Sequence, residues 1–140
     1  MNELTTTNNN SLIADFSDTQ VNTWTSLKAE TYEDKAKLYN TMSNPTGKIS
    51  DLINTEINIV DLFVEMVDIT DDTTGEIITT PRTVIITDMG DSYQAVSRGI
   101  YSSLKKIISV FGPPTWSPAL TVKVVQVELP QGRTFNFRVV

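Results

Sequence analysis

The segment 91–112 gathers side chains of the types that bind a polyanion. It carries Arg98 and two adjacent lysines at 105–106, with Tyr93 and Tyr101 among them. Cations can follow a phosphate backbone, and flat rings can stack on unpaired bases. A solvated helix face offers a second explanation, because lysines near the C-terminal end of a helix interact favourably with its dipole. Tyr101 also falls on a predicted apolar stripe, which favours core packing for this ring.

The chain has 140 residues, no cysteine and no histidine. Serine–histidine and cysteine–histidine nucleophiles are therefore impossible, and so are the usual zinc sites. Acid–base catalysis would have to use carboxylates, lysine or tyrosine. We therefore expect a binding protein rather than an enzyme, and no cofactor.

One set of carboxylates resembles a site for a hard cation. Asp88 and Asp91, with Asp61 or Asp68 farther away in the sequence, carry the oxygens that Mg²⁺ prefers. The letters DMGD are nevertheless typical of a turn, in which aspartates flank a glycine. We therefore expect no metal site.

The formal net charge of −6 hides a gradient along the chain. Residues 1–47 carry a net −3 and residues 48–90 a net −7. Residues 91–140 carry six basic and two acidic side chains, a net +4. Such asymmetry indicates a polyanionic partner. The acidic total argues against tight, nonspecific binding of duplex DNA.

No window approaches the roughly 20 apolar residues of a membrane helix. The first letters, MNELTTTNNN, lack the apolar core of a signal peptide. The absence of cysteine fits a reducing compartment. We expect a cytoplasmic protein with no membrane partner.

The first 26 residues are rich in Thr, Asn and Ser and show no sustained period, which is typical of a mobile arm. An apolar cluster inside this arm, Leu12, Ile13 and Phe16, is followed by Trp24. The arm either folds back on its own domain or docks on a neighbouring copy, which costs little because the same contacts form in trans.

Residues 27–140 predict a single, mainly β domain. A helix is expected over 32–43, with Ala36, Tyr39 and Tyr32 along one side. A second helix follows the N-cap Ser97 and stops at Gly112. A change of phase within 56–69 predicts a bulge, which lets one strand bend and serve two sides of a barrel. The further strands are expected at 77–88, with Pro81 at an edge or bulge, and at 93–97, 120–129 and 133–140.

This order of elements is that of a five-stranded OB barrel, with a helix between the third and fourth strands. An α+β sheet with one packed helix is the alternative. OB barrels bind oligonucleotides across the second and third strands, between the loops that join strands 1–2 and 4–5. Here those loops are 70–76, which is acidic and would repel phosphate, and 129–133, which brings a cation. The candidate nucleic-acid-binding residues are Tyr93, Arg98, Trp116, Arg82, Lys105, Lys123, Arg133 and Arg138; Trp116 fits a plug at the barrel end equally well.

The letters TGEIITTPRTVIITD and SYQAVSRGIYSSLKKIISVFGPPTW carry a resemblance. They resemble the small single-stranded DNA-binding proteins of phages and conjugative plasmids of Gram-positive bacteria, in which a strand, a Tyr-x-x-x-Ser turn, a helix and a Gly-Pro stop recur in this order. The resemblance covers 48–140. It implies an OB fold, sequence-tolerant binding of single strands, and multimers that protect DNA during replication or transfer in a bacterial host.

The chain departs from the cellular members of that functional class, which end in a disordered acidic tip that recruits partner enzymes. Here the last letters, TFNFRVV, predict an ordered strand. We expect single-stranded DNA, or RNA, as the partner, and self-association through the arm. The rival function is a structural subunit of a phage or conjugation apparatus, in which the barrel and the arm make protein–protein contacts only.

Overall fold

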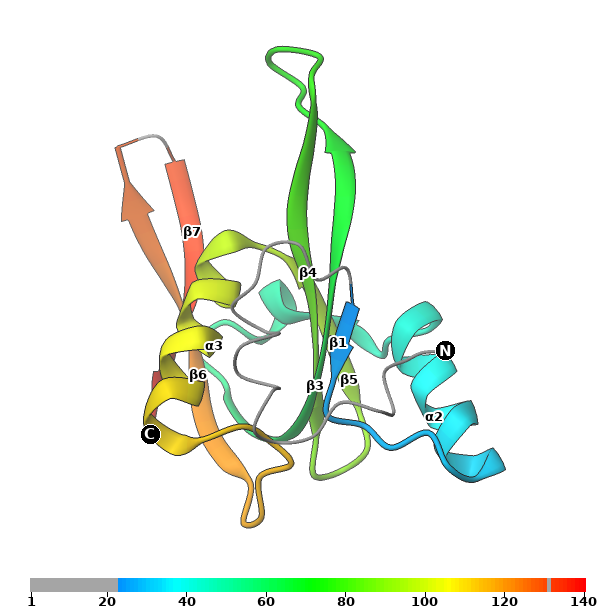
Figure 1. Ribbon diagram of the computed structural model, residues 1–140. Helices are drawn as coiled ribbons and strands as arrows, with labels where there is room; N and C mark the ends of the chain where they lie inside the picture. The colour runs from blue at the N-terminus through cyan, green and yellow to red at the C-terminus, as the bar shows by residue number, and fades with distance from the viewer. Residues whose placement is uncertain (1–22, 131) are drawn as a thin grey trace.

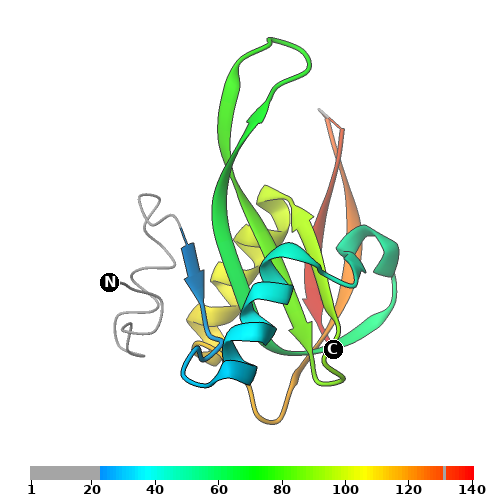
Figure 2. The same ribbon diagram turned by 90° about the vertical axis from the view of Figure 1, so that its right-hand side faces the viewer.

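The computed structural model describes residues 23–130 and 132–140, in which a curled β-sheet is packed by two helices (Figures 1 and 2). The helices are α2 (Tyr32–Ser43) and α3 (Arg98–Phe111), with a short 3-10 helix η2 (Ile49–Leu52). The strands are β1 (Thr23–Thr25), β2 (Gly47–Lys48), β3 (Glu56–Thr70), β4 (Ile77–Thr87), β5 (Ser92–Val96), β6 (Leu120–Leu129) and β7 (Gly132–Val139).

The sheet has the strand order β2-β5-β4-β3-β6-β7, and β1 pairs with β3 at the side of this path. Among the named strands of the described residues, only β2 and β5 pair in parallel, and an isolated bridge between Ile53 and Val124 is parallel as well. The strands expected over 56–69, 77–88, 93–97, 120–129 and 133–140 correspond to β3 through β7 with small shifts at their ends. The mainly β prediction is therefore confirmed.

The long strand β3 bends at Val60, as the change of phase predicted. The pairing register with β4 shifts between Ile59 and Asp61. Along one edge, β3 pairs with β6 before this bulge and with β1 after it; along the other edge, β3 pairs with β4 from Ile59 to Thr70. One strand thus joins the two halves of the curled sheet.

Two apolar clusters lie on opposite faces of the sheet. The inner cluster includes Leu62, Ile85 and Val122 from the sheet, and α3 covers it with Ile100 and Leu104. The smaller outer cluster is made by Leu27, Leu38, Phe63, Val84 and Ile86, of which Leu38 comes from α2. Alternation along β3 and β4 produces both clusters, because successive side chains point to opposite faces.

The predicted bounds of both helices are confirmed by their caps. The Ser97 hydroxyl accepts a hydrogen bond from the Ile100 N–H at 3.2 Å, and Gly112 ends α3 with a φ of 82°. The side of α2 that carries Tyr32 and Tyr39 is not its buried side, since these rings are 84% and 62% exposed. The buried side of α2 carries Leu38 and Thr41 instead.

The folded unit begins earlier than the predicted boundary after residue 26. Thr23–Thr25 form β1, and Trp24 is buried in the inner cluster beside Val64, its partner on β3. The burial of a large aromatic ring explains why this short stretch joins the sheet. Leu12, Ile13 and Phe16 lie outside the described residues.

The predicted closed barrel of five strands is corrected to a curled sheet of seven strands. Within the described residues no strand pairing joins β5 to β7, the two strands that would close it. The edge of β5 pairs instead with β2, at Tyr93 and Gln94. The other strand at the gap, β7, packs against α3. The two approach so closely that a Cβ atom at Gly99 would clash with the carbonyl oxygen of Phe135.

Both long hairpins, β3–β4 and β6–β7, project to the same side of the molecule (Figures 1 and 2). Helix α3 begins at the base of the β3–β4 hairpin, where Arg98 Nη2 donates to the Thr79 carbonyl at 3.0 Å. From there α3 runs away from the hairpin tips (Figure 1). The loop after α3 therefore lies at the opposite end of the curl.

We predict that Gly99→Ala destabilises the protein by about 1–3 kcal/mol, because the added methyl group forces α3 away from the β7 backbone. In an exposed helix the same change would stabilise by roughly 0.5–1 kcal/mol, so the sign of the effect is diagnostic. Urea denaturation measures the free energy of unfolding. Ser102→Ala, at an exposed position of α3, is the matched control and should leave stability nearly unchanged. A Gly99→Ala protein as stable as this control would contradict the close approach.

Candidate nucleic-acid interface

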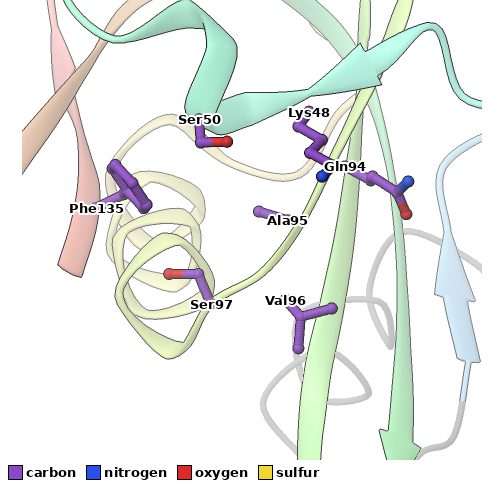
Figure 3. Close-up of a pocket in the computed structure, with 7 residues that line it drawn as sticks. All are labelled: Lys48, Ser50, Gln94, Ala95, Val96, Ser97 and Phe135. Atoms are coloured by element: carbon purple, nitrogen blue, oxygen red, sulfur yellow. The ribbon is translucent and has the colours of Figure 1, made fainter. Parts of the chain in front are cut away.

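A cleft of about 390 Å³ lies where the sheet is left open, between β5 and β7 (Figure 3). We call it the seam cleft. Phe135 of β7 stands on one side and Ala95 and Val96 of β5 on the other, while Ser50 of η2 lies at one end. The lining residues are Lys48, Ser50, Gln94, Ala95, Val96, Ser97 and Phe135.

Strand alternation decides which side chains reach the seam cleft. On β7, Phe135 and Phe137 pack against the inner cluster, so Asn136 and Arg138 point to the outer face. The ring of Phe135 is half-buried, and it contributes to the core and to the cleft wall at once. A concave apolar wall with a few polar groups is the usual composition of a binding site.

The electrostatics of the seam cleft favour an anion beside an apolar group. Ser97, the N-cap of α3, lines the cleft, and a helix N-terminus carries a partial positive charge. No acidic residue occurs in the first turn of α3. Lys48 is exposed at the opposite edge of the cleft, so a positive group stands on each side of it.

Arg82, a predicted contact residue, is engaged within the protein. Its Nη1 donates to Glu65 Oε2 at 2.9 Å, its Nε donates to Gln94 Oε1, and its Nη2 donates to the carbonyl of Met42. Met42 lies in the last turn of α2, which contains no basic residue of its own. Arg82 therefore supplies the cation that stabilises the C-terminal end of this helix.

Two predicted stacking residues face the interior. Trp116 is 7% exposed in the inner cluster, and its Nε1 donates to the Gly112 carbonyl at 3.0 Å. It therefore occupies the plug position that the sequence left open. Tyr93 is half-buried, packs against the same cluster and lies 3.4 Å from the position of a Cβ atom built on Gly47. Neither ring lies in the seam cleft.

The predicted cations do not form one surface. Arg98 is exposed at the start of α3, and Lys105 Nζ lies over the Tyr101 ring, 4.9 Å from its centre. Burial raises the pKa of Tyr101, in agreement with its predicted place at the core. Tyr93, Arg98 and Trp116 are thus not brought together.

The cations of β6 and β7 point to two different faces. Lys123 stands opposite Arg138 in the register, and both lie on the outer face. Arg133 stands opposite Glu128 on the other face, where its Nε lies 3.3 Å from Glu128 Oε2. Both side chains of this second pair are largely exposed, so the pair contributes little to stability.

Sequence reasoning missed four residues that stand out in the structure. Lys48 and Phe135 line the seam cleft. Tyr32 and Tyr39 are exposed seven residues apart on α2, a spacing that places them on the same side of a helix. The apolar spacing of the helix gave the wrong signal for these tyrosines. The alternation along 133–140 predicted that Phe135 points inward. It could not predict the seam cleft, because the cleft exists only where the sheet is left open.

Within the described residues there is no group of three or more carboxylates placed to hold a metal ion. In the same part of the chain, no helix combines the length and apolar character needed to cross a membrane. The chemistry of the seam cleft is therefore inferred from its shape, its aromatic ring and its positive groups.

We predict that Arg82→Ala lowers stability by about 1–3 kcal/mol, because it leaves Glu65 half-buried without its partner and removes the cation from the end of α2. The free energy of unfolding measures this effect. Arg133→Ala, which breaks the exposed pair with Glu128, is the control and should change stability by less than about 0.5 kcal/mol. Equal effects of the two changes would contradict the structural role of Arg82.

In comparisons with known proteins, the family described as phage single-stranded DNA-binding protein matches residues 17–137. Searches of the curated proteins and of the solved structures give no significant match. The matched range includes both described helices, all the strands from β1 to β6 and most of β7. The resemblance inferred from the sequence is thereby confirmed, and the chain belongs to the family of phage single-stranded DNA-binding proteins.

Proposed function

We propose that this protein binds single-stranded DNA in the seam cleft, without strong sequence preference, and coats it. The observation that carries this proposal is the cleft itself, with the Phe135 ring on one wall, Lys48 at its edge and the N-terminus of α3 beside it. Every base has a flat face, so stacking on a ring is tolerant of sequence. Family membership supports the same partner.

In this proposal a base packs against Phe135 and the apolar wall of Ala95 and Val96. The adjoining phosphates lie near Lys48 and the positive end of α3, where helix dipole and side-chain charge act together. Along the edge of β5 that faces away from β4, the residues beyond Gln94 have no strand partner in the described sheet, so the backbone groups of this edge offer further hydrogen bonds. RNA also offers flat bases and phosphates, and competition between the two polymers measures the preference.

We further propose that the fold is a variant of the OB barrel. The chain has the element order of that fold: three strands (β3, β4 and β5), then helix α3, then two strands (β6 and β7). The seam cleft then lies between the third and fifth strands of the barrel, next to the second and third strands that OB folds use for oligonucleotides. This position supports the cleft as the binding site.

We predict that Phe135→Leu weakens binding to oligo-dT by about 1–3 kcal/mol, because leucine keeps the core packed but removes the stacking ring. Lys48→Ala should weaken binding as well and lower the slope of log affinity against log salt by about 0.7. Fluorescence anisotropy over a salt series measures both quantities.

Matched variants on α2 make this test specific. Lys35→Ala removes a cation from an exposed position of α2, and Tyr39→Leu removes an exposed ring there. Both should bind oligo-dT as the unchanged protein does. A loss confined to Tyr39→Leu would move the interface to α2 and contradict the seam cleft.

The wider role that we propose is the protection of single strands during phage DNA replication or conjugative transfer, in the cytoplasm of the bacterial host. The N-terminal arm, with Leu12, Ile13 and Phe16, would link neighbouring copies on the strand.

We predict that deletion of residues 1–20 lowers the mass of the assembly formed on long poly-dT, because it removes the proposed apolar anchors. The deletion retains β1 and should leave the melting temperature nearly unchanged. Analytical ultracentrifugation with and without DNA provides the measurement. An unchanged mass in both conditions would remove the arm from the proposal.

A structural subunit of a phage or conjugation apparatus is the alternative function. The exposed isoleucines of the β3–β4 hairpin favour it, since they suit a contact with protein. A gel shift with labelled oligo-dT separates the two functions, because an assembly subunit would produce no shift.

A further inference from the structure

The β3–β4 hairpin carries the most acidic surface of the described chain. Between Val67 and Thr80 it contains Asp68, Asp71, Asp72 and Glu76 and no basic residue. The hairpin extends beyond the rest of the sheet (Figures 1 and 2). We call residues 68–78 the acidic hairpin. Its charge repels phosphate, so it does not extend the DNA interface.

The acidic hairpin also exposes apolar side chains. Ile77 is 73% exposed, and Ile69 and Ile78, which face each other across the two strands, are each 40% exposed. Isoleucines at the end of a projecting hairpin add nothing to the core. Grouped apolar side chains framed by charge are typical of a surface that contacts another protein.

The exposed side of α3 has the complementary composition. Helix α3 contains Arg98, Lys105 and Lys106 and no acidic residue. Near its C-terminal end Val110, which lies one turn after Lys106 on the same side of the helix, is 76% exposed. We call this surface the basic helix face. It combines cations with an exposed apolar side chain, as the acidic hairpin combines anions with several.

The two surfaces of one molecule point apart. Arg98 holds the start of α3 at the base of the hairpin, through the Thr79 carbonyl. From this point α3 runs away from the hairpin tip (Figure 1). Lys105, Lys106 and Val110 belong to the second half of α3, the half that lies farther from the tip. A contact between the acidic hairpin and the lysines of the basic helix face is therefore available only between two molecules.

We propose that the acidic hairpin of one copy docks on the basic helix face of the next copy. Opposite charges bring the surfaces together, and the isoleucines pack against Val110. Because the two surfaces differ, the contact is head-to-tail, and repeating it produces an open row rather than a closed dimer. Docking of two hairpins on each other is disfavoured, since it would oppose like charges.

This contact leaves the seam cleft unoccupied. Its lining comes from β2, η2, β5, β7 and the N-cap of α3, and includes neither Lys106 nor any residue of the acidic hairpin. A row of copies therefore presents one cleft per molecule. The proposed contact depends on the charges and exposures of the acidic hairpin and the basic helix face. It requires no DNA, so association between copies is measured first without DNA.

The test uses charge reversal on each surface of the full chain. One variant carries Asp72→Lys and Glu76→Lys, two exposed hairpin positions; Asp71 is kept because its Oδ1 accepts the N–H of Thr73 in the turn. The second variant carries Lys105→Glu and Lys106→Glu. A third combines all four changes. The control carries Lys35→Glu and Lys37→Glu, which reverse two exposed charges on α2.

Sedimentation equilibrium at low salt, without DNA, measures association between copies. Each two-residue reversal on a proposed surface should raise the dissociation constant at least about tenfold, because like charges then meet. An equimolar mixture of the first two variants, and the four-residue variant alone, should recover association. The α2 control should associate as the unchanged protein does, and added salt should weaken every association that remains.

Recovery in the mixture is the decisive result, since reversed charges regain attraction only if these two surfaces touch. Loss in both reversals without recovery would overturn the proposal. So would unchanged association in all variants, which would leave assembly to another surface such as the arm. Affinity for a short oligo-dT is measured in parallel. If Lys105→Glu with Lys106→Glu weakens that affinity but not association, the basic helix face binds DNA and the proposal is wrong.

Discussion

The bend of β3 at Val60 is the constraint on which the rest of the structure depends. Along one edge, this single strand of 15 residues pairs with β6 before the bend and with β1 after it, while along the other edge it pairs with β4 from Ile59 onward. The curl of the sheet, the enclosed inner cluster and the position of α3 follow from this change of partner. A bulge bends its strand and increases the local twist, which lets the two halves of the sheet curl around an interior.

The bend also sets where the polar anchors lie. Asp61, the first residue after the bulge, is buried and accepts hydrogen bonds from Ser26 at 2.8 Å and from Thr115. These bonds fasten the segment after β1 and the loop after α3 to the middle of β3. Trp116, next to Thr115, donates its backbone N–H to the Val60 carbonyl, so the loop that plugs the curl is held at the bulge itself.

Local patterns in the sequence predicted most of the fold. The caps Ser97 and Gly112 and the period within 56–69 describe interactions between near neighbours, and the structure confirms them. The pairing of β1 with β3, the pairing of β2 with β5 and the gap between β5 and β7 depend on contacts between distant segments. The approach of Gly99 to Phe135 is one such contact. Such contacts leave no period in the sequence, so the site that they create was missed.

The candidate site illustrates the same limit. Arg82 has the residue type of a phosphate contact, but Glu65 and the end of α2 engage its guanidinium. Lys48 lies in a two-residue strand that no local pattern predicts. Residue type indicates what a side chain can do, whereas its neighbours in space decide whether it is available.

The missing pairing between β5 and β7 has a topological consequence. A pore would require a polymer to thread its free end, and a circular or blocked strand could not enter. The seam cleft is open to solvent along its flank. In the proposed binding mode, a flexible strand would therefore enter the cleft sideways at any internal position and leave the same way, so that loading and release would need no terminus.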